Sequence, residues 1–393
     1  MAGNVSQLIR RNDDNSTRFD SSELMRLESP AESVYLFSAS SLRERARRFQ
    51  LGFPGVVSYA VKANPEARVI KGLLDQGIRH FDVASLGEIE SIAGLCPQAT
   101  LHFNNPVKAR EAVEVAYHRF GVKSFALDEM AEFEKIREAT DSASDITYSV
   151  RFKLEHGSAS YDFGSKFGTS PEVATKILRA VAAIGARPAL TFHPGSQCTD
   201  PAMYSRYVEA AAKIVAESGV DIEQLNVGGG FPEHYTNAQV PDLEVYFESI
   251  RVATEKYFGV APPLMCEPGR AMVASSVSLL TRVIHVREDA CTLFINDGVY
   301  GGMLEQSLVD IQLPVIAWRA GEKIPGGVST YQVFGQTCDP VDSLQGKLQL
   351  PAGMQVGDYL EFGLMGAYGS ATATGFNGFE ATGYVNVERG FSG

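Results

Sequence analysis

Short apolar runs alternate with stretches of helical spacing between about residues 36 and 275. Residues 57–61 predict a strand, and apolar side chains at 69, 70, 73 and 74 predict a helix behind it. Further strands are expected at residues 80–83, 190–192, 225–227 and 264–266, and Ser170 and Pro171 mark the start of another helix. This alternation is typical of βα units that build a parallel sheet.

The predicted strands end in polar or glycine-rich turns. In a (β/α)8 barrel, the loops that leave the carboxyl ends of the strands form the active site. Lys62, Asp82, His193, Gly228 to Gly230 and Glu267 are expected there. A barrel needs about 250 residues, so the length of 393 residues leaves room for one smaller domain.

After about residue 276 the helical spacing fades. Apolar runs at 277–286, 291–295, 331–334 and 359–362 are separated by turns with Gly, Pro and Asp, which predicts an antiparallel β domain. We therefore expect an α/β fold: a TIM barrel followed by a C-terminal antiparallel β-barrel or sandwich domain.

Composition and charge narrow the possible partners. The apolar fraction of 45% is that of a globular chain with a sizeable core. The net charge of −12 disfavours nucleic acids and anionic lipids as partners. The N-terminal region lacks the apolar run of a signal peptide, and no window reaches the 18 apolar residues of a membrane helix. Five scattered cysteines without a CxxC pair predict neither disulfides nor a zinc site, so a reduced, cytoplasmic protein is expected.

Two motifs after predicted strands could recognise a phosphorylated ring. Gly228, Gly229 and Gly230 would let backbone N–H groups approach a phosphate, although a run of three glycines is often only a flexible loop. Glu267 precedes Pro268, Gly269 and Arg270, and a buried carboxylate beside a pyridine nitrogen would keep that nitrogen protonated. A structural ion pair between Glu267 and Arg270 is an equally good interpretation.

Three further side chains suggest covalent or ring chemistry. Lys62 follows an apolar strand, where desolvation would favour an imine with an aldehyde, whereas most lysines at strand ends are simply solvated. His193 could stack on a flat ring or be a hydrogen-bonded structural residue. The other six histidines do not lie at metal-ligand spacing, so no metal is expected. Cys338 and Asp339 couple a thiol to a carboxylate in the β domain, although cysteine is most often apolar filler.

These motifs occur in a fixed order that resembles a known family. YAVKAN, FDVAS, KFG, FHPGSQ, NVGGGFP, CEPGR, QTCDPVD and GAYGSATATGFNGF resemble the fold type III decarboxylases, the group of eukaryotic-type ornithine decarboxylase and diaminopimelate decarboxylase. The resemblance runs from about residue 35 to 380. It implies an alanine racemase-like barrel over residues 36–275, with residues 1–35 and 276–393 forming the β domain.

The resemblance also implies pyridoxal 5'-phosphate as the cofactor and assigns roles to individual residues. Lys62 would bind the cofactor aldehyde, His193 would stack on the ring, and Glu267 would pair with the ring nitrogen. The phosphate would be held by Ser196, Gly228, Gly229, Gly230, Arg270 and Tyr368. Asp82, Glu88 and Arg151 match positions near the cofactor and its lysine.

In this family the active site lies at a homodimer interface. Cys338 and Asp339 should therefore serve the partner subunit's cofactor, with Cys338 as proton donor and Asp339 facing the distal amine of the substrate. The implied reaction is the decarboxylation of a basic amino acid, ornithine or lysine in polyamine biosynthesis.

The substrate stays open at this point. The segment after Tyr300 departs from the ornithine type, so the second acid that would grip the substrate amine is Glu305 or Asp310. Gln197 and Gln336 are further departures. A diaminopimelate-like or specialised siderophore or antibiotic amino acid is an alternative. A racemase and a catalytically inactive binding protein are the remaining alternatives.

Overall fold

The computed structural model describes residues 19–154, 166–381 and 383–392. It divides into two compact units. One unit comprises residues 46–233 and 240–272, and the other comprises the chain up to residue 45, residues 234–239 and the chain from residue 273 onwards. Residues 1–18 of the expected β domain lie outside the described residues.

The first unit is a closed barrel of eight parallel strands, which confirms the predicted TIM barrel. The strands pair in chain order, and the last closes onto the first. They are β2 (Val56–Ala60), β3 (His80–Val83), β4 (Thr100–Phe103), β5 (Ser124–Leu127), β6 (Thr147–Arg151), β7 (Arg187–Thr191), β8 (Gln224–Asn226) and β9 (Leu264–Cys266). The predicted strands at 80–83 and 264–266 match their observed bounds, and the others differ by one to three residues.

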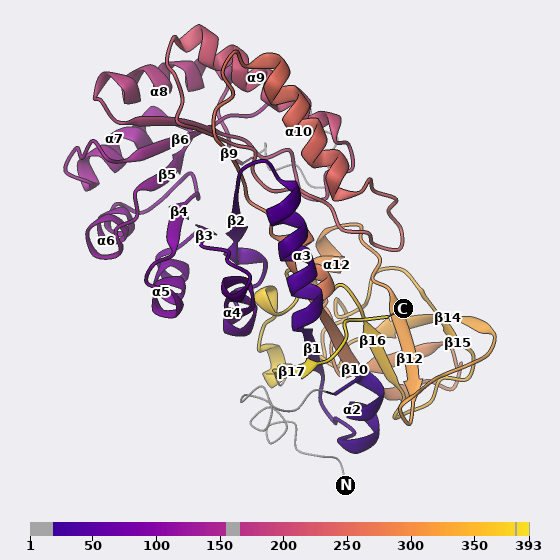
Figure 1. The fold of residues 1–393 in the computed structure, drawn as a ribbon. Coiled ribbons are helices and arrows are strands. Elements are labelled where there is room, and N and C mark those ends of the chain that lie inside the picture. Colours follow the sequence, from indigo (N-terminus) through magenta and orange to yellow (C-terminus); the bar gives the residue numbers. More distant parts are fainter. Residues whose placement is uncertain (1–18, 155–165, 382, 393) are drawn as a thin grey trace. The chain divides into compact units, whose positions relative to one another are not determined.

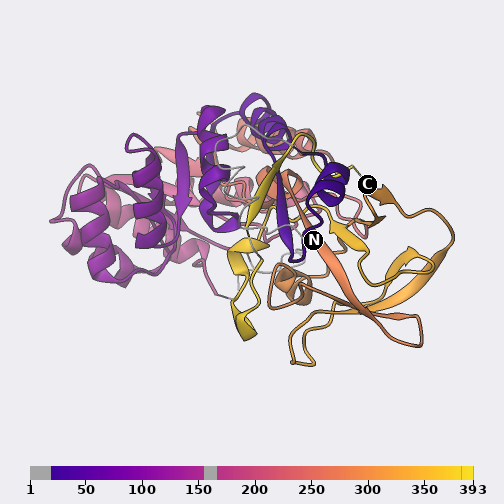
Figure 2. The same ribbon diagram turned by 90° about the horizontal axis from the view of Figure 1, so that it is seen from below.

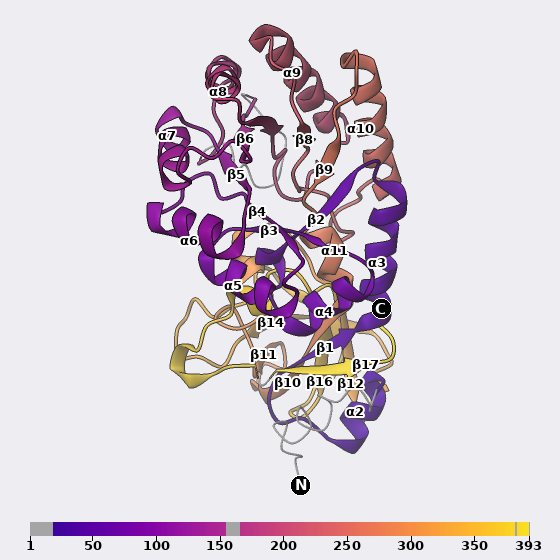
Figure 3. The same cartoon turned by 60° about the vertical axis from the view of Figure 1, so that its left-hand side comes forward.

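Helices follow the strands and surround the barrel (Figure 1, Figure 3). They are α4 (Ala67–Asp75), α5 (Leu86–Leu95), α6 (Arg110–Phe120), α7 (Met130–Ala139), α8 (Pro171–Ala183), α9 (Ala202–Ser218), α10 (Leu243–Tyr257) and the short α11 (Arg270–Val273), with the 3-10 turn η1 (Val61–Ala63) after β2. Helix α3 (Ala39–Gly52) crosses the boundary between the units.

Local signals explain where several helices begin and which face they bury. The Oγ of Ser170 accepts a hydrogen bond from the backbone N–H of Val173, and Pro171 opens α8. In α4 the side chains of Val69, Ile70 and Leu73 are fully buried, as their helical spacing predicts.

The second unit is built on one mixed sheet of nine strands. They are β1 (Val34–Ser38), β10 (Val277–Val286), β11 (Thr292–Ile295), β12 (Val315–Arg319), β13 (Glu322–Lys323), β14 (Val328–Phe334), β15 (Leu348–Pro351), β16 (Tyr359–Phe362) and β17 (Tyr384–Val387). Its described residues also form the α-helices α2 (Ser21–Leu27) and α12 (Leu304–Leu308) and the 3-10 turns η3 (Ala274–Ser276), η4 (Ser370–Thr372) and η5 (Phe376–Gly378).

The expectation of a purely antiparallel domain was wrong for two strand pairs. β1 pairs with β17 in parallel, and β11 pairs with β14 in parallel. Figure 2 shows the indigo strand β1 beside the yellow β17, so segments from both ends of the described chain share one sheet. β1 also pairs with β10, which brings an N-terminal strand into a sheet whose other strands come from the C-terminal part.

Candidate active site

A cavity of about 240 Å³ lies at the carboxyl ends of the barrel strands. Its lining comes from residues after or at the ends of β2, β3, β4, β6, β7 and β9, all within the barrel unit. The lining residues are Lys62, Asp82, Ala84, Asn104, Asn105, Pro106, Arg151, Lys166, Phe167, His193 and Glu267. Five side chains expected from the sequence, those of Lys62, Asp82, Arg151, His193 and Glu267, therefore meet around one space.

Lys62 reaches this cavity from the turn η1, directly after β2. The backbone N–H of Ala60 bonds to the carbonyl oxygen of Pro268, which joins the end of β2 to the segment after β9. Val61 and Ala63 on either side are buried, whereas Lys62 itself is exposed. The turn thus points a single amine into the cavity from a fixed backbone.

Glu267 follows β9 and is held by two amides. The Nδ2 groups of Asn104 and Asn226 both donate to its Oε1. Its backbone N–H donates to the carbonyl oxygen of Gly228. Within the described part of the chain, no hydrogen bond to Oε2 is present.

His193 lies at the end of β7, with its ring orientation fixed by the backbone. Its Nδ1 accepts a hydrogen bond of 3.0 Å from the N–H of Gly195, so the proton of the neutral ring sits on Nε2. Burial lowers the pKa of His193 well below its usual value, and the charges of Arg151 and Lys62 lower it further. A neutral, fixed imidazole is suited to stacking against a flat ring.

The charged groups of the cavity shift one another's pKa values. Burial and the neighbouring Glu267 raise the pKa of Asp82, while Lys62 and Arg151 oppose that rise. Burial lowers the pKa of Arg151, whose guanidinium lies 5.6 Å from the ring centroid of Phe167. Glu88 is not a lining residue, but its Oε2 accepts a hydrogen bond of 2.6 Å from the N–H of Ala84, which is one.

The glycine run after β8 allows a very close approach between loops. A Cβ at Gly228 would lie 2.1 Å from the carbonyl oxygen of Phe192, and one at Gly230 would lie 2.3 Å from that of Gly195. Gly228 and Gly230 also have positive φ angles of 68° and 89°. Only glycine fits both the close approach and the positive φ, so the packing of the two loops requires these glycines.

Ser196 and Arg270, which were expected at the phosphate, do not line the cavity. Arg270 is buried at the start of α11. Gln197, after Ser196, fixes the other side of the loop: its Nε2 donates to the carbonyl oxygen of Glu233 and its Oε1 accepts from the N–H of Glu233. The unusual Gln197 is thus a buried structural clamp.

The second unit contains the other predicted residues. The Oη of Tyr300 donates to the Oδ2 of Asp339 at 2.9 Å, and the Sγ of Cys338 lies 3.4 Å from the Oδ1 of Asn377. Hydrogen bonds from the backbone N–H of Val341 and from Tyr300 lower the pKa of Asp339. Cys338 is exposed.

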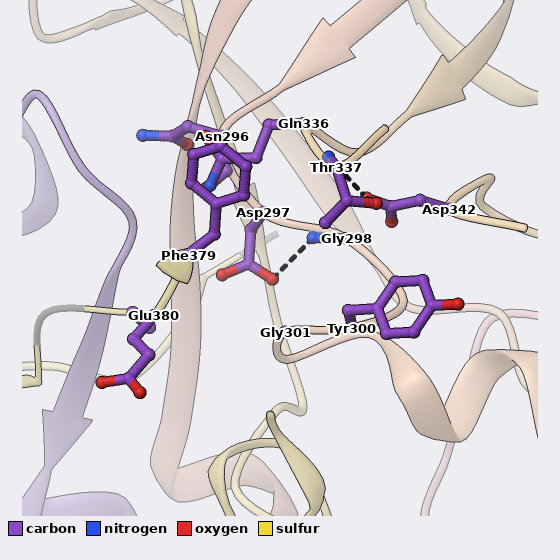
Figure 4. A pocket seen from close by; sticks show the side chains of 11 residues that line it. Asn296, Asp297, Gly298, Tyr300, Gly301, Gln336, Thr337, Asp342, Phe379 and Glu380 are labelled. Carbon is purple, nitrogen blue, oxygen red and sulfur yellow. Dashed lines mark hydrogen bonds between the residues drawn. The ribbon is translucent and has the colours of Figure 1, made fainter. Parts of the chain in front are cut away.

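A buried carboxylate organises the same loop. Asp342 accepts hydrogen bonds from the N–H of Val299 and from both the N–H and the Oγ1 of Thr337. Figure 4 shows Asp342 bonded to Thr337. The small cavity drawn there has a volume of about 10 Å³, which is room for no more than about one water.

The remaining predicted residues of this unit have simpler surroundings. Asp310 is exposed and bonds to the Nδ2 of Asn237 at 3.4 Å. Glu305 lies in the first turn of α12. Tyr368 has a positive φ of 58°, and its carbonyl oxygen accepts a hydrogen bond from Thr372.

Sequence reasoning missed the two asparagines that hold Glu267. Asn104 follows β4 directly and Asn226 is the last residue of β8. From the sequence, no strand was predicted at residues 100–103 and residue 226 lay inside a strand predicted at 225–227, so neither asparagine stood at a predicted strand end. Their neutral amides gave no separate chemical cue.

Comparison with known proteins supplies the family. Residues 39–274 match the model described as "Pyridoxal-dependent decarboxylase, pyridoxal binding domain". The chain belongs to this family. Decarboxylase flvG of Aspergillus flavus is 32% identical over 82% of this chain and 78% of its own length. Lysine/ornithine decarboxylase of Selenomonas ruminantium is 31% identical over 82% of this chain and 81% of its own length.

Crystal structures of relatives agree with this assignment. The structure of lysine/ornithine decarboxylase from Vibrio vulnificus, complexed with putrescine, has a TM-score of 0.81 and 27% identity. It covers 94% of this chain and 99% of that one. This chain is accordingly an amino-acid decarboxylase that uses pyridoxal phosphate.

The geometry fits that cofactor. The glycine loop leaves no space for any Cβ at Gly228 or Gly230, an amine enters the cavity at Lys62, and Glu267 keeps one oxygen without a hydrogen bond from the described residues. Within those residues there is no cluster of three His, Cys, Asp or Glu side chains placed to hold a metal ion. Nor does any helix among them combine the length and apolar character needed to cross a bilayer.

Proposed function

We propose that this decarboxylase removes the α-carboxylate of a basic amino acid with a distal amine, ornithine or lysine, and that Lys62 holds its cofactor. The observation that carries the proposal is the meeting of Lys62, His193 and Glu267 around one cavity. Relatives support the substrate class, because their names include lysine/ornithine decarboxylase and ornithine decarboxylase.

When bound, pyridoxal phosphate supplies an electron-accepting ring that stabilises the charge left as CO2 departs. Glu267 would face the ring nitrogen and hold a proton there, while the neutral His193 would cover one face of the ring. Ser196, Gly228 to Gly230, Arg270 and Tyr368 would hold the phosphate. Asp82 and Arg151 would set the charge around Lys62.

Cys338 and Asp339 complete the proposal from the second unit. Cys338 would return a proton to the reacting carbon, and Asp339 would bind the distal ammonium of the substrate. The lowered pKa of Asp339 supports this role, because it keeps the carboxylate charged. Glu305 and Asp310 are the two candidates for a second substrate acid.

A homodimer with shared sites is part of the proposal. Large apolar side chains are exposed near Cys338 and Asp339: Val341 at 63%, Phe376 at 40% and Phe379 at 40%. Tyr300, which bonds to Asp339, stacks on Phe376 with a centroid distance of 4.5 Å. Apolar side chains gathered in this way are typical of a protein interface. In such a dimer, Cys338 and Asp339 would act on the partner subunit's cofactor.

The lysine assignment can be tested directly. Borohydride reduction of the holoenzyme followed by peptide mapping should place the cofactor on Lys62, and Lys62→Ala should lose turnover. Label on a different lysine would refute the assignment. A panel of ornithine, lysine, arginine and diaminopimelate, followed by CO2 release, tests the substrate. Preference for diaminopimelate would contradict a diamino monoacid.

A further inference from the structure

The two carboxylate oxygens of Glu267 have different surroundings. Oε1 accepts hydrogen bonds from Asn104 Nδ2 at 2.5 Å and from Asn226 Nδ2. Oε2 accepts none from the residues that the structure describes, and Glu267 lines the cavity. One oxygen is therefore anchored in the barrel wall, and the other is available to a ligand.

Asn226 connects the two ends of the proposed cofactor site. This side chain is fully buried, and its Oδ1 accepts a hydrogen bond of 2.9 Å from the N–H of Gly228. Its Nδ2 donates to Glu267, whose own N–H bonds to the carbonyl oxygen of Gly228 at 2.8 Å. A single amide thus ties the glycine loop to the carboxylate, and both of its ends have a defined partner.

Asn104 contributes to the carboxylate alone. Its backbone N–H bonds to the carbonyl oxygen of Val83, which fixes the position of its Cα after β4. Its Oδ1 has no hydrogen-bond partner among the described residues. Exchanging oxygen and nitrogen would place two acceptors against each other, so the amide must point its N–H to Glu267.

We propose that Asn104 and Asn226 are positioning residues that hold Oε1 of Glu267 and thereby present its Oε2 to the ring nitrogen of pyridoxal phosphate. This inference rests on the proposed role of Glu267. Two N–H donors on one carboxylate oxygen restrict the rotation of the side chain and leave the other oxygen for the ligand. With that oxygen aligned on the ring nitrogen, the nitrogen keeps its proton, which strengthens the electron sink.

The test uses holoenzyme loaded with pyridoxal phosphate that carries ¹⁵N in the ring. The variants are Asn104→Leu and Asn226→Leu, which are close to Asn in size and lack the donor, with Glu267→Gln as reference. Gln50→Ala is the matched control, since it removes an exposed amide that donates to the carbonyl oxygen of Gln76 on the same barrel. If a Leu variant does not fold, the Ala variant replaces it.

The ¹⁵N resonance of the ring should show the loss of the nitrogen proton at the same pH in the wild type and in Gln50→Ala. Each Asn variant should lose that proton at a pH about one unit lower, which corresponds to about a tenfold change per donor. Asn226→Leu should also bind the cofactor more weakly than Asn104→Leu, because of the two asparagines only Asn226 bonds to Gly228. Both variants should lower kcat more than they raise KM.

The outcomes separate the two ideas. If Glu267→Gln deprotonates the ring nitrogen and both Asn variants keep the wild-type profile, the positioning role is wrong, whatever their stability. If Glu267→Gln also keeps the wild-type profile, the proposed role of Glu267 itself fails.

Discussion

At the scale of single residues, the carboxylate of Asp339 is prepared for a cation by its own unit. Tyr300 donates to Oδ2 at 2.9 Å, and the N–H of Val341 donates to Oδ1 at 2.9 Å. These donors stabilise the charged form and restrict the rotation of the side chain. An ordered anion should bind a distal ammonium with a smaller loss of entropy than a mobile one.

We expect Tyr300→Phe to raise KM for a diamino acid about threefold to tenfold, as the loss of one solvent-accessible hydrogen bond of ordinary strength predicts. Phenylalanine keeps the ring that stacks on Phe376, so kcat at saturating substrate should change little. Steady-state kinetics with the preferred substrate measure this. An unchanged KM would show that Asp339 does not bind the amine through the geometry seen here.

Residues with their own chemistry were predictable, and residues that act through others were not. Lys62, His193 and Glu267 carry an amine, an imidazole and a carboxylate at strand ends, so position and chemistry agreed. Asn104 and Asn226 are neutral amides whose importance appears only once Glu267 lies within hydrogen-bond distance. Local sequence carries no record of that distance.

At the scale of elements, the close contact between the β7 and β8 loops predicts a specific loss. Gly228→Ala would place a methyl group 2.1 Å from the carbonyl oxygen of Phe192 at a φ of 68°, so the loops must separate. We expect cofactor affinity to fall at least tenfold, measured by fluorescence titration.

Gly219→Ala is the matched control for that variant. Gly219 ends α9 at a φ of 66° and has no atom within 4 Å of a built Cβ. The Gly219→Ala substitution should lower the unfolding free energy by roughly 1 kcal/mol, because alanine disfavours the left-handed backbone, and should leave cofactor affinity unchanged. Equal affinity in both variants would mean that the close approach does not shape the cofactor site.

Two histidines on adjacent strands predict how barrel stability depends on pH. His80 Nδ1 and His102 Nε2 lie 3.0 Å apart, and burial with the charge of His80 lowers the pKa of His102 to about 3. Burial therefore makes protonation of His102 less favourable in the folded protein than in the unfolded chain. The resulting contribution to the free energy of unfolding is present in full above the unfolded pKa of 6.5 and is lost as pH falls toward 3. At pH 4 the free energy of unfolding is lower by about 3 kcal/mol because of His102.

His102→Gln keeps a side chain that can hydrogen-bond to His80 and cannot be protonated in this range. Between pH 7 and pH 4 the unfolding free energy of the variant should therefore fall less than that of the wild type. The two falls should differ by roughly 3 kcal/mol. Urea unfolding at both pH values measures the difference. Parallel losses in the two proteins would show that His102 is protonated as easily in the folded barrel as in the unfolded chain.

Strand positions were easier to predict than strand partners. Residues 277–286 and 359–362 match β10 and β16, because local apolar runs define strands. The direction of pairing depends on segments far apart in the chain, such as β1 and β17. Two parallel pairs therefore escaped a prediction based on short turns.

At the scale of the whole molecule, the proposed shared sites predict complementation between inactive subunits. A mixture of Lys62→Ala and Cys338→Ala should regain activity, because a mixed dimer combines one intact Lys62 with one intact Cys338. Random exchange makes half of the dimers mixed, each with one working site of two, so roughly a quarter of wild-type activity should return.

Mass spectrometry with one labelled subunit should confirm that the subunits exchange, and each variant alone should be severely impaired. Exchange without regained turnover would show that Lys62 and Cys338 act within one chain, and the shared site would be abandoned.

The division into two units also separates what evolution can change. All of the residues that line the larger cavity belong to the barrel unit, whereas Tyr300, Asp339 and Glu305 belong to the sheet unit. If the sheet unit selects the substrate as proposed, mutations at these three residues can change the accepted amine while Lys62, His193 and Glu267 in the barrel unit stay unchanged. A new product could thus arise from mutations outside the barrel.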